Sequence, residues 1–289
     1  MKIKISELFY SLQGEGRFIG VPSVFLRTFG CNFTCSGFGM APGQVTTEAD
    51  VIGAQHKLVP FATFEGLPLV TTGCDSYASW HADFKDLSPM LTVDAIVERM
   101  LALTPNGRWV QDNGNDVHLV ITGGEPLLGW QRAYPDLLNH PRMADLKNIT
   151  FETNGTQKLS KDFCAYLQQW ADYGARDREV TFSVSAKLSA SGEKWDEAIC
   201  PEIVTEYQQY GHAYLKFVVE TKEHIDEAVR AVAAFRAGGF RGVVYLMPVG
   251  GTLSPYDANT QLVAQECITR GFNFSPRLHI SLFGNSWGT

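Results

Sequence analysis

Seven short runs rich in β-branched and aromatic residues recur along the chain, and stretches long enough for a helix separate most of them. They cover residues 24–27, 117–122, 149–153, 180–185, 215–220, 243–247 and 278–281. Strands that alternate with helical segments are typical of repeated βα units around a parallel sheet. About six such units are too few for a closed eight-stranded barrel. The sequence therefore predicts an α/β fold with an open, partial (βα)6-type barrel.

Two of the intervening segments have a clear helical pattern. Thr92 precedes apolar residues at helical spacing over 93–103, and Pro105 follows them. Thr221 precedes a second pattern of this kind, which stops at Gly238. Threonine is a common N-cap, whereas proline and glycine end helices. The sequence therefore predicts one helix after each threonine.

The composition limits the classes of function. The chain has 289 residues, of which 45% are hydrophobic, so it can bury the core of the single domain that we expect over residues 1–289. A formal net charge of -7 argues against a nucleic-acid-binding surface, which needs clustered lysine and arginine. No apolar run approaches the roughly 20 residues that span a bilayer. Six cysteines in a chain of this length are not a disulfide framework, so we expect a reducing cytoplasm.

Three of the cysteines form a pattern that suggests an iron–sulfur cluster. Cys31 and Cys35 open a segment, CNFTC, that resembles the cluster loop of radical S-adenosylmethionine (SAM) enzymes. Such a loop usually has its third cysteine three residues after the second, where this chain has Phe38. Cys74 is the next cysteine, and we expect it to complete the set. Three thiolates on a 4Fe-4S cluster leave one iron for the amino and carboxylate groups of SAM.

The segment between Cys35 and Cys74, residues 36–73, interrupts the alternation of strands and helices. It is rich in glycine and proline and has only brief apolar stretches. A loop of this length within a compact domain is usually functional or contains small elements of its own. We expect an insertion in the cluster loop that also covers part of the active site. The alternative is a tolerated surface excursion.

Polar motifs follow four of the predicted strands. They are TGGEP at 122–126, ETNGT at 152–156, SAK at 185–187 and MPVGG at 247–251. Folds of this type hold their sites at the carboxyl edge of the sheet, so we expect these motifs to meet. Upstream, FYSLQGEG at 9–16 suits a heterocycle with an amidine-like edge, and Arg27 suits a carboxylate. An ordinary glycine turn and a structural ion pair are the respective alternatives.

Together, the segments 9–16, 20–27 and 30–32 and the GGEP and ETNGT motifs resemble the 7-carboxy-7-deazaguanine synthase family, over residues 8–220 without the insertion and more weakly to His279. The resemblance implies a partial barrel of the radical SAM superfamily. It implies a carbon–nitrogen lyase that converts 6-carboxy-5,6,7,8-tetrahydropterin to 7-carboxy-7-deazaguanine with loss of ammonia, toward queuosine. It also implies a 4Fe-4S cluster, SAM, Mg²⁺, an external flavodoxin-like electron donor and a homodimer.

The same resemblance implies roles for individual residues. Cys31, Cys35 and Cys74 would ligate the cluster, and Ser76 would ligate Mg²⁺. The residues implied for SAM are Gly73, Asp75, Gly124, Glu125, Ser185, Ala186, Lys187, Met247, Pro248 and Val249. Those implied for the substrate are Leu12, Gln13, Gly14, Glu15, Arg27 and Thr122. No catalytic residue is expected beyond these ligands, because the cofactors supply the reactive chemistry.

The chain departs from the family pattern in three places. These are the insertion, Gly73 where an aromatic residue often precedes the third cysteine, and the tail at 283–289. Three alternatives stay open: a glycyl-radical-activating enzyme with a similar cysteine loop, a cluster-less protein that binds a purine-like ligand, and a zinc site on the same cysteines. Cys164, Cys200 and Cys267 lie in or beside expected helices, where free buried cysteine is common.

Overall fold

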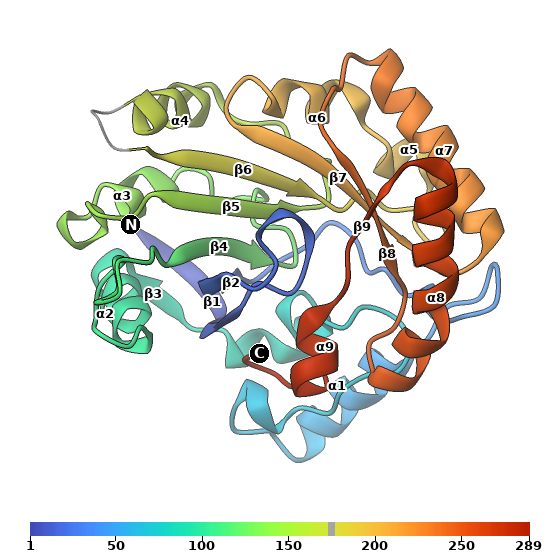
Figure 1. The fold of residues 1–289 in the computed structure, drawn as a ribbon. Helices are drawn as coiled ribbons and strands as arrows, with labels where there is room; N and C mark the ends of the chain where they lie inside the picture. Colours follow the sequence, from blue (N-terminus) through green and yellow to red (C-terminus); the bar gives the residue numbers. More distant parts are fainter. Residues whose placement is uncertain (173–176) are drawn as a thin grey trace.

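The structure is a computed structural model that describes residues 1–172 and 177–289. Within these residues one nine-stranded sheet has the order β3-β1-β2-β4-β5-β6-β7-β8-β9 and curves into an open barrel (Figure 1). The strands are β1 (Lys2–Leu12), β2 (Pro22–Thr28), β3 (Met90–Thr92), β4 (His118–Gly123), β5 (Asn148–Thr153), β6 (Glu179–Val184), β7 (His212–Val219), β8 (Val244–Pro248) and β9 (Asn273–Phe274). Neighbours from β2 to β9 are parallel, whereas β1 is antiparallel to β2 and β3. The predicted partial α/β barrel is confirmed.

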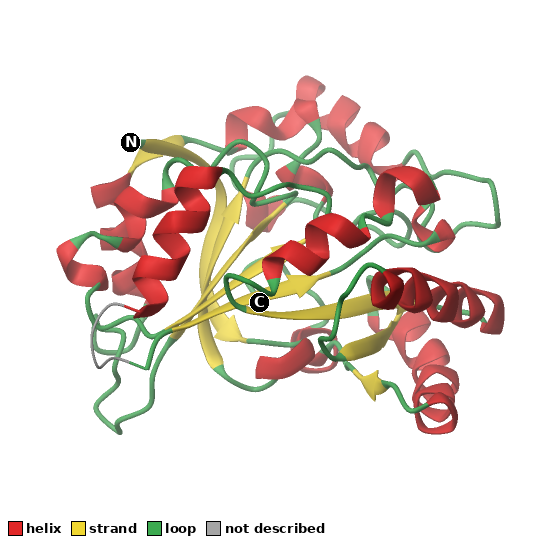
Figure 2. Cartoon of the chain, turned by 90° about the horizontal axis from the view of Figure 1, so that it is seen from above, coloured by secondary structure: helices red, strands yellow, loops and turns green. Residues whose placement is uncertain are grey.

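Helices surround the sheet on its outside (Figure 2). In the described residues the α-helices are α1 (Glu48–Leu58), α2 (Val93–Leu103), α3 (Tyr134–Leu138), α4 (Lys161–Asp172), α5 (Trp195–Ala198), α6 (Pro201–Tyr207), α7 (Lys222–Ala237), α8 (Leu253–Arg270) and α9 (Leu278–Phe283). Short 3-10 helices are η1 (Gly16–Phe18), η2 (Phe64–Gly66), η3 (Tyr77–Ser79), η4 (Ala82–Leu87), η5 (Pro141–Met143) and η6 (Ser189–Ser191). The helices predicted after Thr92 and Thr221 are α2 and α7. Each threonine hydroxyl accepts a backbone N–H, at 3.3 Å in both cases.

One of the seven predicted strands is wrong. Residues 278–281 belong to α9, which ends at Gly284, a residue in the left-handed conformation with φ 64. A run as short as Leu-His-Ile-Ser fits either a strand or one turn of helix, and a left-handed glycine is a common helix end. The sheet edge beside β8 is instead occupied by β9. The other six runs fall in β2 and in β4 to β8.

Two of the apolar clusters in the described residues hold the helices and the insertion in place. The larger one joins the sheet to α2, α4, α6, α7 and α8 through buried rings such as Phe151 and Phe217. The smaller one lies in the insertion, where Ile52 and Phe64 pack with Tyr77. Residues 36–73 therefore contain a helix, α1, and a core that they share with the segment following Cys74.

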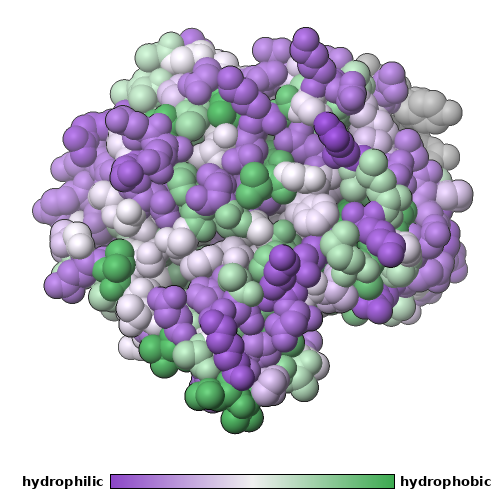
Figure 3. All heavy atoms as spheres, turned by 180° about the vertical axis from the view of Figure 1, so that it is seen from behind, coloured by the Kyte–Doolittle hydropathy of each residue, from purple (hydrophilic) through white to green (hydrophobic). Residues whose placement is uncertain are grey.

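The surface seen from behind is mostly hydrophilic, and apolar residues gather at its lower end (Figure 3). Figure 1 places α1 and its neighbours at that end of the molecule. Val51, Leu58 and Val59 from this part of the chain are exposed. In the part of the chain that the structure describes, no helix combines the length and the apolar character needed to cross a membrane.

Candidate functional site

A cavity of about 260 Å³ lies within the curve of the sheet. Residues from β1, β2 and β4 to β8 line it, and the insertion and the tail complete its wall. Phe38, Gly39, Leu69, Val70 and Thr71 come from the insertion, and residues 285–289 come from the tail. Residues 36–73, which were predicted to cover part of the site, therefore contribute to the wall of the pocket.

All three expected cluster ligands line this pocket. Cys31, Cys35 and Cys74 lie in one apolar cluster with Phe33 and Ala198. Burial raises the pKa of the Cys31 thiol to about 12, and burial also raises the pKa of Cys35 and of Cys74. Each is therefore a protonated thiol at neutral pH, and it would have to lose its proton to bind a metal. Three sulfur donors in one cluster at the same pocket fit the cysteine set of a 4Fe-4S cluster.

The same thiols do not surround a point suited to one metal ion. Among residues 1–172 and 177–289, no group of three or more His, Cys, Asp or Glu side chains is arranged to hold a single ion. A cubane cluster binds each cysteine through a different iron, so its ligands lie farther apart than those of one ion. A structural zinc ion needs four close ligands. The described residues therefore give the zinc alternative no support.

Gly124 lets the GGEP turn pack directly against the cluster loop. A Cβ atom at Gly124 would lie 2.7 Å from the Cβ atom of Cys31, well inside the roughly 3.5–4.0 Å at which carbon atoms pack. The N–H of Glu125 donates to the Gly30 carbonyl oxygen at 2.7 Å. Gly30 itself has φ 115, a conformation that favours glycine. The turn after β4 therefore fixes the position of Cys31.

Most residues implied for SAM surround the same cavity. Its lining includes Gly73, Asp75, Gly124, Ser185, Lys187, Met247 and Val249. The Lys187 ammonium donates to the Ser185 hydroxyl at 3.1 Å. Ala186 and Pro248 lie outside the described lining, and Ala186 packs into the main core instead. Successive side chains of an extended segment point to opposite faces, which separates Ala186 from its two neighbours.

Glu125 also lies outside the described lining, with its side chain fully buried. Its carboxylate accepts the N–H of Asn154 at 2.7 Å, the N–H of Leu127 at 3.0 Å and the hydroxyl of Thr153 at 2.8 Å. Burial raises the pKa of Glu125 to about 7, against the opposite effect of these hydrogen bonds. In this structure Glu125 joins the ends of β4 and β5.

All residues implied for the substrate line the pocket: Leu12, Gln13, Gly14, Glu15, Arg27 and Thr122. The Gln13 amide donates to the Glu152 carboxylate at 3.1 Å and accepts the N–H of Glu15 at 3.0 Å. The loop that follows crosses the sheet, because the Phe18 ring contacts the ring of His118 in β4. The polar segment after β1 therefore lies against the sheet, with Gln13 near the end of β5 and Phe18 at the start of β4.

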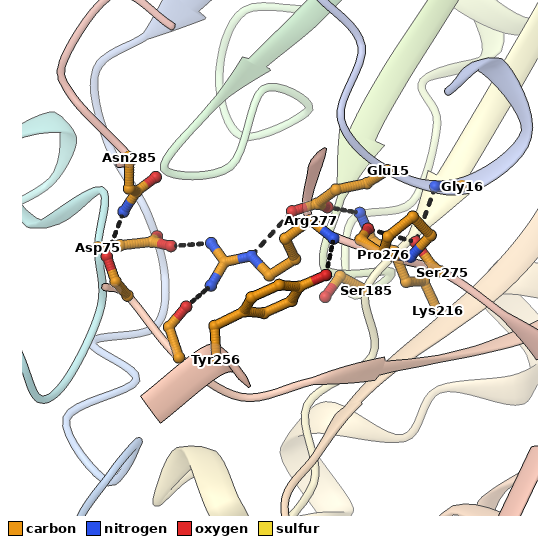
Figure 4. Close-up of polar contacts among 12 residues, drawn as sticks. Glu15, Gly16, Asp75, Ser185, Lys216, Tyr256, Ser275, Pro276, Arg277 and Asn285 are labelled. Carbon is orange, nitrogen blue, oxygen red and sulfur yellow. Dashed lines mark hydrogen bonds and ion pairs between the residues drawn. The ribbon is translucent and has the colours of Figure 1, made fainter. Parts of the chain in front are cut away.

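A chain of largely buried ion pairs connects this segment to distant parts of the sequence (Figure 4). Glu15 pairs with Lys216 of β7, and Arg277 Nε donates to Glu15 Oε1 at 3.2 Å. The same guanidinium donates to the Asp75 carboxylate and to the Gly250 carbonyl oxygen. Burial alone would raise the pKa of Glu15, but Lys216 and Arg277 hold it well below its usual range.

The sequence analysis did not assign Lys216 and Arg277 to the site. Lys216 stands in the apolar run of β7, and a charge inside a buried strand is the signal that could have identified it. Arg277 lies two residues before His279, whose ring contacts Gly14 and lines the pocket. Burial lowers the pKa of His279 to about 4, and Arg277 adds to this effect.

Arg27 takes part in a second polar group. Its Nε donates to Glu7 at 2.8 Å, and its Nη1 donates to the Ser76 hydroxyl at 2.9 Å. Ser76 in turn donates to Asp75 at 3.4 Å. Hydroxyl and carboxylate oxygens are hard donors of the kind that Mg²⁺ prefers. The structural ion pair given as the alternative for Arg27 is present, and it adjoins the residue expected to bind Mg²⁺.

The fold and the site together define an open, partial βα barrel with three cysteine thiols and several polar strand-end motifs around one pocket. No protein-family model matches the chain. The chain is similar over nearly its whole length to curated proteins named 7-carboxy-7-deazaguanine synthase. The protein from Pyrobaculum aerophilum is 29% identical over 99% of this chain and 97% of its own length, and that from Halobacterium salinarum is 29% identical over 98% and 91%.

A shorter and closer match supports the same assignment. The 7-carboxy-7-deazaguanine synthase of Bacteroides thetaiotaomicron is 61% identical over 59 residues, which are 20% of this chain and 32% of that protein. A crystal structure of QueE from Escherichia coli has the same fold, with a TM-score of 0.53 at 22% identity over 96% of this chain and 95% of that one. The resemblance seen in the sequence is therefore confirmed along nearly the entire chain.

Proposed function

We propose that this protein is a radical SAM 7-carboxy-7-deazaguanine synthase. It would convert 6-carboxy-5,6,7,8-tetrahydropterin to 7-carboxy-7-deazaguanine by a ring contraction that releases ammonia. The observation that carries the proposal is that the distant Cys74 thiol lies in one pocket with the thiols of Cys31 and Cys35 and with the polar segment after β1. The full-length similarity to proteins of that name supports it over the glycyl-radical-activating enzyme and the cluster-less binder.

Cys31, Cys35 and Cys74 would hold the 4Fe-4S cluster, with SAM bound beside it. The cluster, when bound, supplies the electron that generates a radical from SAM. The chain itself binds and encloses the reactants. Ser185 and Lys187 present polar groups to SAM, and the side chains of the insertion and the tail limit the access of water to the pocket.

The substrate would occupy the part of the pocket next to Gln13 and Glu15. Carboxylate and amide oxygens there accept hydrogen bonds from the amidine-like edge of a pterin. The charge of Glu15 is maintained by Lys216 and Arg277. Because these partners are buried and fixed, Glu15 presents its carboxylate without a large cost of reorganisation when the ligand binds.

Mg²⁺ would bind at Ser76, close to the carboxylate of the substrate. Asp75 and Glu7 place negative charge near this hydroxyl, and Arg27 supplies a cation that can turn to a carboxylate. Magnesium usually keeps few protein ligands and completes its shell with substrate and water. One serine oxygen with neighbouring carboxylates is consistent with such a small set of protein ligands.

The remaining proposals concern organisation. We infer one domain over residues 1–289 with the insertion at 36–73 as part of the cluster loop, a homodimer in the cytoplasm, and reduction by a flavodoxin-like donor. The contact of the insertion with the segment after Cys74 supports the single domain. The family resemblance supports the other three.

The variant Cys74→Ala tests the assignment. After anaerobic reconstitution, the wild-type protein should bind about four irons per chain and form the deazaguanine from the carboxypterin. Cys74→Ala should lose most of the iron and all turnover, because two thiolates do not hold the cluster.

Cys200→Ala is the matched control, since Cys200 is a free cysteine at the start of α6. Full activity in Cys74→Ala would refute the ligand set. SAM cleavage without deazaguanine would instead favour a glycyl-radical-activating enzyme.

A further inference from the structure

Glu193 contacts the cluster loop, although neither the family resemblance nor the strand-end motifs point to it. One oxygen of its carboxylate, Oε1, accepts two successive backbone N–H groups, from Thr34 at 2.9 Å and from Cys35 at 2.7 Å. Hydrogen bonds to a charged acceptor are roughly twice as strong as neutral ones. These two hydrogen bonds therefore join segments that are about 160 residues apart in the chain. One of the two donors is Cys35, an expected iron ligand.

The backbone at this point has an unusual conformation. Cys35 has φ 49, and among the described residues other than glycine only Asn285 shares a positive φ. The left-handed conformation costs a residue with a side chain roughly 1–2 kcal/mol, so the surroundings must hold it. Successive N–H groups that converge in this way form a concavity for an anion. The carboxylate of Glu193 occupies that concavity.

The segment that carries Glu193 is itself fixed. Ser189 donates its N–H to the Glu227 carboxylate of α7 at 3.0 Å. The N–H of Gly37, two residues after Cys35, donates to the Ser191 carbonyl oxygen at 2.9 Å. A Cβ atom at Gly37 would lie only 2.5 Å from the backbone nitrogen of Gly192. The two backbones are therefore in direct contact beside the Glu193 hydrogen bonds.

We propose that Glu193 is a positioning residue for the cluster, and the proposal rests on the function given above. It holds Cys35 in the conformation that directs the thiol to the pocket. It also keeps a negative charge beside the cluster, and negative charge near a cluster lowers its reduction potential. The segment that contains Glu193 follows Ser185 and Lys187 in the sequence, with only η6 between them. The same stretch of chain therefore holds the cluster loop and contributes to the SAM site.

Two variants separate the hydrogen bonds from the charge. Glu193→Gln keeps an oxygen that can accept both N–H groups and removes the charge. Glu193→Ala removes both. Glu197→Gln is the matched control, because Glu197 lies on the same segment but pairs with Lys194 at the surface, where solvent screens its charge.

The first measurement is hydrogen exchange of the Thr34 and Cys35 amides in the full chain without iron. Both amides should be protected in the wild type, in Glu193→Gln and in Glu197→Gln, and should exchange faster in Glu193→Ala. The second measurement is iron content with the reduction potential, from a titration followed by electron paramagnetic resonance. Glu193→Gln should bind as much iron as the wild type at a less negative potential, whereas Glu197→Gln should match the wild type.

The proposal is overturned if Glu193→Gln has the potential of Glu197→Gln, or if Glu193→Ala leaves amide exchange and iron content unchanged. A wild-type protein that binds no iron would refute the proposed function instead. In that case the exchange measurement still decides whether Glu193 holds the loop.

Discussion

Several charged side chains of the pocket are paired, although they are largely removed from water. Glu15 and Asp75 share Arg277, and Lys216 completes the group. A buried charge without a partner costs several kcal/mol, so each member depends on the others. Only part of this arrangement was readable from the sequence. Glu15 was identified by its glycine-flanked motif, whereas Arg277 and Lys216 lie more than 200 residues away, and pairing over such distances depends on the fold.

His118 gives a prediction about pH. Burial lowers its pKa to about 3, and its ring contacts the Thr150 hydroxyl at 2.9 Å. A lowered pKa in the folded state means that stability present above pH 6.5 is lost as the pH falls toward 3, because the unfolded chain binds the proton first. Between pH 7.5 and pH 5 this loss amounts to about 2 kcal/mol.

The variant His118→Gln should therefore reduce the dependence of the unfolding free energy on pH by about that amount. Urea unfolding at the two pH values measures it. His212→Gln is the control, because His212 is exposed at the start of β7. An equal acid loss in wild type and His118→Gln would contradict the prediction.

At the scale of elements, strands were easier to predict than the segments around them. The parallel strands are buried on both faces and therefore appear as continuous apolar runs. Strand β1 was missed because polar residues such as Lys4 and Glu7 interrupt its apolar pattern. Residues 278–281, Leu-His-Ile-Ser, were predicted as a strand because the two apolar residues alternate with polar ones and the run is too short to show a helical period. The helix in the insertion was not predicted either, since α1 has a weakly amphipathic sequence and is held by tertiary contacts.

The tail and the insertion stabilise each other through one tryptophan. The Trp287 ring packs edge-on against the rings of Phe64 and Tyr77, and its Nε1–H donates to the Leu67 carbonyl oxygen at 3.0 Å. Trp287→Ala should cost roughly 2 kcal/mol, less than the 3–5 kcal/mol typical of a fully buried ring, because Trp287 is half-buried.

The loss should be local. Limited proteolysis of Trp287→Ala should cut residues 59–72 faster than in the wild type, while the main core keeps its resistance. Trp195→Ala, which removes a tryptophan from the surface near Arg230, serves as the control. Unchanged cleavage of the insertion would show that the tail does not hold it.

At the scale of the whole molecule, the pocket unites motifs from both ends of the chain. Arg277 contacts Glu15 from the first loop, Asp75 from the end of the cluster loop and Gly250 from the turn after β8. Arg277→Lys keeps the charge but loses the planar fork that reaches all three. It should lower the free energy of unfolding by roughly 2–3 kcal/mol.

The control for this substitution is Arg270→Lys. Arg270 on α8 also pairs with two carboxylates, Glu266 and Asp226, but at the surface, where ion pairs contribute little. Thermal unfolding of both variants measures the difference. If Arg277→Lys unfolds at the same temperature as Arg270→Lys, the buried network does not join the distant motifs energetically.

The place of Arg277 also bears on how the protein matures. The amino end of a chain leaves the ribosome first. Glu15 and Asp75 therefore emerge long before Arg277, whose guanidinium pairs with both carboxylates. Until residue 277 has left the exit tunnel, two carboxylates in the nascent pocket lack this partner, and water must solvate them. The site consequently forms this contact only after residue 277 has been made, and a product that stops before it would lack the contact.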